Sequence, residues 1–451
     1  MALGKRRGNR QQDLWIAADA VARTPRHVFY ERLNRLLAKA EFDGWLEALC
    51  RPYYAEAGRH SIPPGVYFRM LFIGYFEGID AQRGIAWRCA DSLSLKQFLG
   101  LGPTEATPEH SSLTKIRQRL PLSVCQEVFQ FVLTLVEKHK LLVAREVGVD
   151  STTLEANAAM KSIVRKDTGE DWQAYVTRLM QEEGLIGPDE TPPAAELRRF
   201  DRERKDKKVP NEEWENPHDP EARIARMKDG RTHLAYKAEH VVDLATEAIV
   251  AAEVYAADAA DTATLVPSLE QAQQNLDTTE SGRFIEKVAA DKGYHAIDTL
   301  VACQELDLAG VKTYIPEPVG ARRWTDKTKE QKAAVLNNRA RTQRAYGKRL
   351  QRKRSERVER SFAHVCDTGG GRRTWLRGLE NVRKRHLLLA AAHNLGLILR
   401  KLLGAGKPRA LSALWQLLRV LQNAQVKLLT ILVALRTSKL CVRTYISPPQ
   451  P

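Results

Sequence analysis

The sequence predicts an α/β fold, in which helices flank a mixed sheet and further helical segments precede and follow it. Three observations support this prediction. Residues 11 to about 140 have the apolar periodicity of helices, with short breaks. A contiguous group of apolar strands follows at residues 147 to 157, 234 to 243 and 248 to 255. Shorter strands then alternate with helices, an order typical of a mixed sheet covered by helices.

Length, charge and cysteine usage narrow the class of protein. A chain of 451 residues is long enough for two or three domains. We expect a helical part at 1–140, an α/β part at 141–403 and a helical tail at 404–451. A net charge of +16 indicates a polyanionic partner, most often nucleic acid. The six cysteines form no Cys-x-x-Cys pair, which argues against zinc or disulfides and fits a reducing cytosol.

No membrane association is expected. The first ten residues are basic, but no apolar run of the kind found in secretory signals follows them. The most apolar run, residues 428 to 435, is far too short to span a bilayer. We therefore expect a cytoplasmic protein.

The N-terminal part contains two informative helices. Residues 66 to 76 are apolar on most faces, which suits a buried helix. Ser111 and Ser112 are placed to cap a second helix, and its Leu113, Ile116 and Leu120 share one face, as the spacing requires. Its more exposed side then carries the basic residues Lys115, Arg117 and Arg119. This helix suits helix-turn-helix DNA binding, and it equally suits an ordinary solvated face.

Charged segments interrupt and follow the strands. Residues 160 to about 230 are rich in charges and prolines, and we interpret them as an insertion of amphipathic helix and loop. Residues 321 to 360 contain fifteen Lys and Arg against four acids, a density typical of a nucleic-acid-facing surface. Arg339, Arg341 and Arg344 are candidate phosphate contacts there. A helix with the buried stripe Val358, Phe362 and Val365 should end this segment.

Three carboxylates stand on separate predicted elements. Asp150 lies within the first strand, Asp291 follows the strand at residues 284 to 290, and Glu359 lies on the helix after the sheet. Mg²⁺ prefers oxygen ligands and is held by few protein carboxylates. Two such ions about 4 Å apart can activate an attacking oxygen and stabilise the leaving oxygen of a phosphodiester. The alternative for Asp150 alone is that it ends the strand and caps a turn.

These residues resemble the DDE motifs of bacterial insertion-sequence transposases. The three matching stretches are Val149-Asp150-Ser151-Thr152, Asp291-Lys292-Gly293-Tyr294-His295 and Val358-Glu359-Arg360-Ser361-Phe362. The flanking stretches Asp219-Pro220-Glu221-Ala222-Arg223, Lys237-Ala238-Glu239-His240 and Leu376-Arg377-Gly378-Leu379-Glu380-Asn381 also look like signatures of that family. Residues 61 to 120 are similar to its N-terminal domain, and the resemblance covers roughly residues 60 to 400.

The resemblance implies an RNase H-like catalytic domain that cleaves DNA and transfers the strand. It implies Asp150, Asp291 and Glu359 as ligands of two Mg²⁺ ions, or Mn²⁺ in their place. The expected partners are the inverted repeats at the element ends, target DNA and a second copy of the chain in a homodimer. Relatives carry Arg four residues before the Glu and Lys seven after it, where this chain has Ser355 and Cys366. Phosphate contacts would then come from Arg354, Arg372, Arg373 or Lys384.

Several alternatives stay open at this point. An RNase H-like nuclease without joining activity would use the same acids, and a transposase-derived DNA-binding regulator would need none of them. Glu356 competes with Glu359, and Asp243 also ends a strand. Trp375 is either a stacking platform for an unpaired base or a packing residue. His295 and His364 are either metal ligands or residues that only surround the site.

Overall fold

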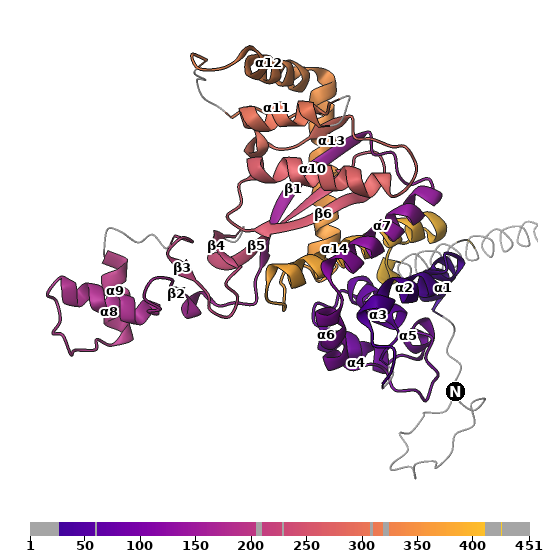
Figure 1. Cartoon of the computed structure of the whole chain (residues 1–451), viewed down its shortest axis with the longest axis horizontal. Coiled ribbons are helices and arrows are strands. Elements are labelled where there is room, and N and C mark those ends of the chain that lie inside the picture. Colours follow the sequence, from indigo (N-terminus) through magenta and orange to yellow (C-terminus); the bar gives the residue numbers. More distant parts are fainter. Residues whose placement is uncertain are drawn as a thin grey trace, which may run out of the picture.

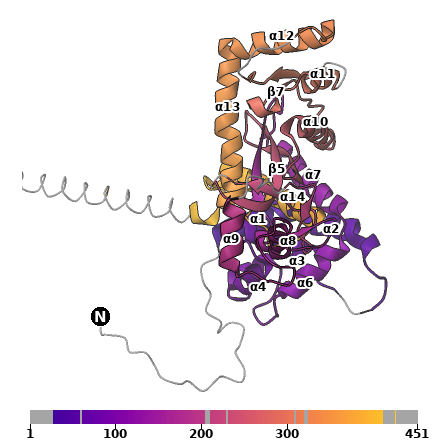
Figure 2. The ribbon, with the colours of Figure 1, turned by 90° about the vertical axis from the view of Figure 1, so that its left-hand side faces the viewer.

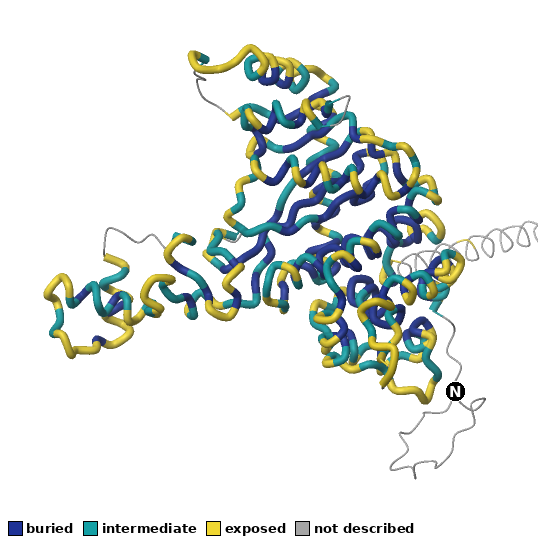
Figure 3. The backbone as a smooth tube through the Cα atoms, viewed as in Figure 1, coloured by how far each residue is buried: buried dark blue, intermediate teal, exposed yellow. Residues whose placement is uncertain are grey.

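The computed structural model describes residues 27–58, 61–203, 210–227, 230–306, 310–318, 324–410 and 425. A mixed sheet lies at its centre, helices cover the sheet, and the N-terminal helices pack together below it (Figure 1). The buried residues of the sheet and of these helices, dark blue in Figure 3, belong to one continuous core. The predicted α/β fold class is confirmed.

The main sheet has six strands, and β1 lies in its middle. β1 pairs antiparallel with β5 on one side and parallel with β7 on the other, and β8 follows β7 in parallel. β6 and the short β4 both pair antiparallel with β5. The strands are β1 (Glu146–Glu155), β4 (Arg223–Arg226), β5 (Thr232–Asp243), β6 (Ile249–Ala256), β7 (Lys287–Ala289) and β8 (Lys312–Tyr314).

The sheet confirms most of the predicted strands. β1 buries Val147, Val149 and Leu154, as expected for a strand with neighbours on both sides. The strands predicted at residues 234 to 243 and 248 to 255 are β5 and β6, which form an antiparallel hairpin whose turn places Glu247 at a φ of 69°. The two later strands are shorter than expected, at three residues each. β4 lies inside the predicted insertion, so the part of residues 160 to 230 that it occupies belongs to the sheet.

Helices cover both faces of the sheet. Successive residues of a strand point to opposite faces. Ser151 contacts Asp261 at the start of α10, whereas Asp150 contacts Arg354 on α13, so α10 and α13 lie on opposite faces. α13 is a long, straight helix beside the sheet (Figure 2). The helices of this part are α10 (Asp261–Asp277), α11 (Ile297–Glu305), α12 (Lys329–Gln343), α13 (Ala345–Phe362), the π turn Ala363–Asp367 and α14 (Leu379–Leu403).

The N-terminal helices pack against α14. Nearly every residue of α3 is buried, as its apolar sequence predicts. Ser92 accepts a hydrogen bond from the Leu95 amide and caps α5. Ser111 and Ser112 lie inside α6 because that helix already begins at His110, so their predicted capping role is wrong. The helices are α1 (Val28–Lys39), α2 (Phe42–Cys50), α3 (Pro64–Glu77), α4 (Gln82–Ala90), α5 (Leu93–Phe98), α6 (His110–Arg119) and α7 (Leu122–Lys138), with the 3-10 turn Arg51–Tyr53 after α2.

α14 is the main core helix. The segment Leu379–Ala410 is long and apolar enough to cross a membrane, but 72% of its most apolar window is buried inside the protein. That burial is typical of a core helix in a folded domain. The predicted helical tail at residues 411 to 440 lies outside the described residues, apart from residue 425.

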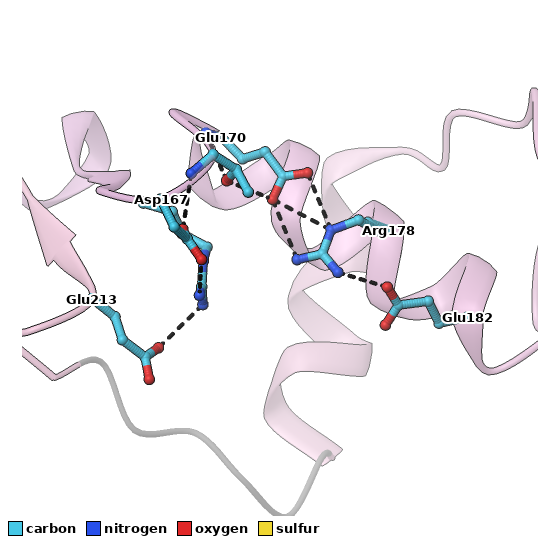
Figure 4. A network of polar contacts seen from close by, with 7 residues as sticks. Asp167, Glu170, Arg178, Glu182 and Glu213 are labelled. Atoms are coloured by element: carbon cyan, nitrogen blue, oxygen red, sulfur yellow. Dashed lines mark hydrogen bonds and ion pairs between the residues drawn. The ribbon is translucent and has the colours of Figure 1, made fainter.

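The insertion between β1 and β5 projects away from the sheet (Figures 1 and 3). Its helices enclose a small apolar cluster around Val176, Met180 and Leu197. Arg178 bridges Glu170 and Glu182, and a neighbouring arginine pairs with Asp167 and Glu213 (Figure 4). These ion pairs are largely exposed, so they orient the helices more than they stabilise them. The elements are the 3-10 turn Met160–Ser162, β2 (Val164–Arg165), α8 (Trp172–Glu182), α9 (Ala194–Glu203) and β3 (Trp214–Glu215).

Buried histidines join α14 to the sheet. The Nε2 atoms of His240 on β5 and His386 on α14 lie 2.8 Å apart, and His240 Nδ1 lies 2.8 Å from the Ser361 hydroxyl. The His240 ring stacks on Phe362, with ring centroids 4.1 Å apart. Burial lowers the pKa of His386 and of the nearby His393 to about 3. Both side chains are therefore neutral in the native state near neutral pH.

We predict that acid weakens this part of the core. An unfolded chain protonates histidine below a pKa of about 6.5, whereas the native chain does not until about pH 3. Stability is therefore fully present above pH 6.5 and falls as the pH drops below it, by on the order of 2 kcal/mol per histidine at pH 5. Urea midpoints at pH 7.5 and pH 5 measure the loss.

His386→Gln keeps hydrogen-bonding capacity without a titrating group, so its urea midpoint should change less with pH. His218→Gln is the control because His218 is exposed in the insertion. An equal pH dependence in the parent and in His386→Gln would contradict the prediction.

Candidate active site

Asp150 lies near the centre of the sheet, on the face that α13 covers. It is partly buried, with 22% of its side chain exposed. Its Oδ1 accepts a hydrogen bond from the Ser151 amide at 2.8 Å, and its Oδ2 pairs with Arg354 Nη1 at 2.6 Å. Asp150 does not end β1, which continues to Glu155, so the alternative of a simple strand-ending cap is wrong.

Asp291 follows β7 on the neighbouring strand. Gly148 of β1 is paired with Ala289 of β7, and Asp150 and Asp291 each stand two residues beyond this pair. Because the strands are parallel, both residues lie at a similar level along the sheet. Asp291 Oδ1 accepts the Gly293 amide at 2.8 Å, which holds the turn after the strand.

Gly293 fits a crowded position between two carboxylates. A Cβ there would lie 2.5 Å from Asp261 Oδ2 and 3.0 Å from Asp291 Oδ1. A larger residue would therefore displace one of these side chains. Gly293 is therefore needed for close packing at this turn.

Glu359 lies on α13 and is exposed. It accepts a hydrogen bond from Ser355 at 3.1 Å. Arg357, on another edge of α13, pairs with Glu247 at the β5–β6 turn, which lies at the N-terminal end of β1. The edge with Ser355 and Glu359 therefore faces the other way, towards the end of the sheet where Asp291 stands.

α13 can approach β1 closely because residue 148 is glycine. A Cβ on Gly148 would lie 2.8 Å from Leu244 Cδ2, 2.9 Å from Val358 Cγ2 and 3.0 Å from Arg354 Cγ. Val358 is fully buried at this contact, as the predicted stripe requires. The helix that carries Arg354 and Glu359 is thus positioned by the absence of a side chain on β1.

The three carboxylates do not form a closed metal site. Within the described ranges, no group of three acidic, histidine or cysteine side chains lies close enough to hold a metal ion. The carboxylate oxygens nevertheless have the donor chemistry that Mg²⁺ and Mn²⁺ prefer. Arg354 now occupies one oxygen of Asp150.

The competing acids have other partners. Asp243 is fully buried and accepts hydrogen bonds from the Val143 and Ala245 amides and from the Thr246 hydroxyl, so it stabilises a turn. Glu356 pairs with Arg360 at 2.6 Å, one turn along the exposed side of α13. His364 lies against the His393 ring.

A buried polar network lies behind the carboxylates, on the α10 face. Lys237 Nζ pairs with Asp261 Oδ1 at 2.6 Å, and the Tyr294 hydroxyl donates to Glu239 Oε2 at 2.7 Å. Burial raises the pKa of the Glu239 carboxyl. The network ties the turn after Asp291 to β5 and α10. The sequence signal for it was two charged residues, Lys237 and Glu239, in the middle of a predicted strand.

Three predicted phosphate-contacting arginines surround the C-terminal half of β1. Arg354 pairs with Asp150, and Arg372 bonds to Thr152 and to Asp367. Arg373 lies 3.5 Å from Glu155 and stacks over Trp375 at 4.5 Å. The structure therefore brings these three together beside the carboxylates.

The other predicted arginines divide into exposed and structural ones. Arg344 is exposed at the start of α13, as expected. Arg339 pairs with Glu317 at 2.8 Å, and Arg341 donates to the Thr313 carbonyl at 3.0 Å on β8. Arg341 is therefore a structural residue, because its guanidinium forms hydrogen bonds with β8 at the edge of the sheet.

The basic helix α6 shows the same division. Lys115 and Arg119 are exposed, as predicted. Arg117 turns inward, and its Nε and Nη1 atoms are buried beneath α14, so its predicted exposure is wrong. The helical repeat of α6 cannot reveal this, because residues of α3, α4 and α14 surround that side.

Two family models match the chain. A Transposase domain (DUF772) model matches residues 19–119, and a Transposase DDE domain model matches residues 206–395. Asp291 and Glu359 fall within the second match, and Asp150 lies between the two. Searches of curated proteins and of solved structures return no significant match.

The fold, the strand order and these matches define a transposase with an RNase H-like domain. The chain belongs to the DDE-type insertion-sequence transposases.

We predict that Gly148→Ala displaces α13. The added methyl would contact three side chains at 3.0 Å or less, and overpacking of this kind costs about 1–3 kcal/mol. The urea midpoint should fall accordingly. Gly44→Ala in α2 is the control, since a Cβ there meets nothing within 4 Å and alanine favours helix. A midpoint for Gly148→Ala equal to that of Gly44→Ala would refute the packing argument.

Proposed function

We propose that this protein binds the ends of its own element, cleaves DNA with divalent metal ions and joins the ends to target DNA. One observation carries the proposal. Asp150 and Asp291 stand at a similar level of adjacent parallel strands, and the helix that contacts Asp150 also carries Glu359. Asp150 lies outside the DDE-domain match, so its inclusion rests on the sequence around it and on this geometry.

Asp150, Asp291 and Glu359 would hold the metal ions. Bound Mg²⁺, or Mn²⁺, would activate the attacking oxygen and stabilise the leaving oxygen of a phosphodiester. In this chain, the Ser151 and Gly293 amides orient the two aspartates, and Ser355 orients Glu359. Arg354, Arg372 and Arg373 supply positive charge for the phosphates beside them.

A basic stripe on α13 would guide DNA towards these acids. Lys348 and Arg352 are exposed and follow Arg344 at intervals of four residues, so the three side chains share one side of the helix. Ser355 and Glu359 continue on nearly the same side. The DNA backbone would then run along α13 towards Glu359.

The N-terminal helices would recognise the element ends. Lys115 and Arg119 are the exposed cations of α6 in this proposal. We place the protein in the cytoplasm and expect a homodimer to act on the two ends, with no membrane involved. Sequence preference would come from the N-terminal part, and non-specific phosphate contacts from α13.

We predict that Asp150→Asn, Asp291→Asn and Glu359→Gln each reduce metal-dependent cleavage and joining by on the order of 10²-fold or more. Each change keeps the side-chain shape but removes one negative charge from the metal ligands. Labelled end DNA with Mg²⁺ or Mn²⁺ measures both steps. In EDTA, DNA affinity should hold or rise, because less negative charge faces the phosphates.

Glu356→Gln is the matched control on the same helix and should stay active. Three mutants that cut and join like the parent would exclude this carboxylate assignment. A parent that cuts but never joins would indicate a nuclease, and one that binds ends but never cuts would indicate a regulator.

We also predict that Lys348→Ala and Arg352→Ala each flatten the salt dependence of DNA binding. Each lost phosphate contact should change the slope of log affinity against log salt by about 0.9. Sequence preference should not change. Lys138→Ala, an exposed residue at the end of α7, is the control. An unchanged slope in both variants would make the stripe an ordinary solvated face.

A further inference from the structure

A cavity of about 410 Å³ lies between the N-terminal helices and α14. Residues of α3, α4 and α6 line one side, and the loop with Trp375 and the first turns of α14 line the other. None of the three candidate carboxylates lines it. Its volume is typical of a site for a small organic ligand.

Much of the cavity wall is apolar or aromatic. Tyr67 and Leu71 contribute from α3, and Leu376 and Leu388 from the opposite side. Trp375 also lines the cavity, with 44% of the residue exposed, and its Nε1 donates to Asp80 at 2.9 Å. Such walls suit a flat, weakly polar group.

The charged residues of the lining are mainly cationic. Arg83, Arg117, Lys384 and Arg385 line the cavity, and Asp80 is the acid among the lining residues. Arg117 Nε and Nη1 are buried and have no hydrogen-bond partner in the described part of the chain. Buried polar groups without partners are costly, and an anion beside them would satisfy these donors.

The cavity adjoins the proposed DNA surface. Arg373 stacks over Trp375 and lies against Glu155, at the end of the strand that carries Asp150. The same short loop therefore contributes to the cavity and to the cations near the carboxylates.

We propose that this cavity binds a single nucleotide, with the base against the apolar wall and the phosphate on Arg117. The inference rests on the proposed function, because a DNA-joining enzyme meets nucleotides at strand ends. The nucleotide comes either from a DNA strand or from solution as a free mononucleotide. Either occupant would bridge α6 and α14 and so connect the N-terminal helices to the catalytic part.

Calorimetric titration of the full-length protein with dAMP and dTMP tests the proposal. Deoxyadenosine and inorganic phosphate serve as the separate halves of the ligand and should bind more weakly than dAMP. Arg117→Met should weaken dAMP binding about tenfold or more, the usual effect of losing a hydrogen bond to a charged group. Trp375→Ala should also weaken it.

Matched controls distinguish an effect on the cavity from the general effect of removing a cation or a tryptophan. Arg35→Met removes an exposed cation from α1, and Trp87→Ala removes an exposed tryptophan from α4, so both should bind dAMP like the parent. Arg83→Gln tests the cavity at an exposed residue, where misfolding is not a concern. It should weaken dAMP binding even if Arg117→Met fails to fold.

The DNA arm uses duplexes with and without one unpaired terminal nucleotide. A preference for the unpaired end that Arg117→Met or Arg83→Gln abolishes would assign the nucleotide to a DNA strand. Binding of free dAMP with that dependence, without a preference for the unpaired end, would assign it to solution. If neither ligand binds, or if neither substitution changes binding, the proposal fails. Asp150→Asn should bind dAMP like the parent. A loss of DNA cleavage can therefore be told apart from a loss of nucleotide binding in the cavity.

Discussion

The close contact between α13 and β1 determines the geometry of the candidate site. Gly148 lets Val358 and Arg354 press against the strand, and the Arg354–Asp150 ion pair lies two residues further along. Breaking one partner of such a partly buried pair leaves a charge without its counter-ion, which costs more than the pair itself contributes. The position of Glu359 follows from this contact, because the same helix carries Arg354 and Glu359.

Much of the fold could be predicted because the relevant signals are local. β1, the β5–β6 hairpin, α3 and the buried stripe of α13 all have clear apolar periodicity. The short β7 and β8 were predicted with loose boundaries, because three-residue strands depend on pairing more than on composition. β4 could not be recognised, since its sequence is charged and only the edge of β5 makes it a strand.

The sequence could predict the types of residue in the candidate site, but not which of its arginines are exposed. Motif resemblance proposed Asp150, Asp291 and Glu359, and the strand register places each of the first two two residues beyond the Gly148–Ala289 pair. Charge density could not distinguish Arg344, which is exposed, from Arg341, which bonds to β8, because both occupy the same basic run. Arg117 shows the same limit, since its burial depends on a helix more than 250 residues later in the chain.

The ion pair between Asp150 and Arg354 can form only late in the synthesis of the chain. Asp150 and Arg354 are 204 residues apart in the chain. A ribosome that adds about 5–20 residues per second needs roughly 10–40 s to make the intervening segment. During that interval a nascent chain has the first acid but neither α13 nor Glu359. In the proposed function, a chain that ends before α13 has the N-terminal helices and Asp150 but lacks Glu359, and we expect it to bind DNA without cutting it.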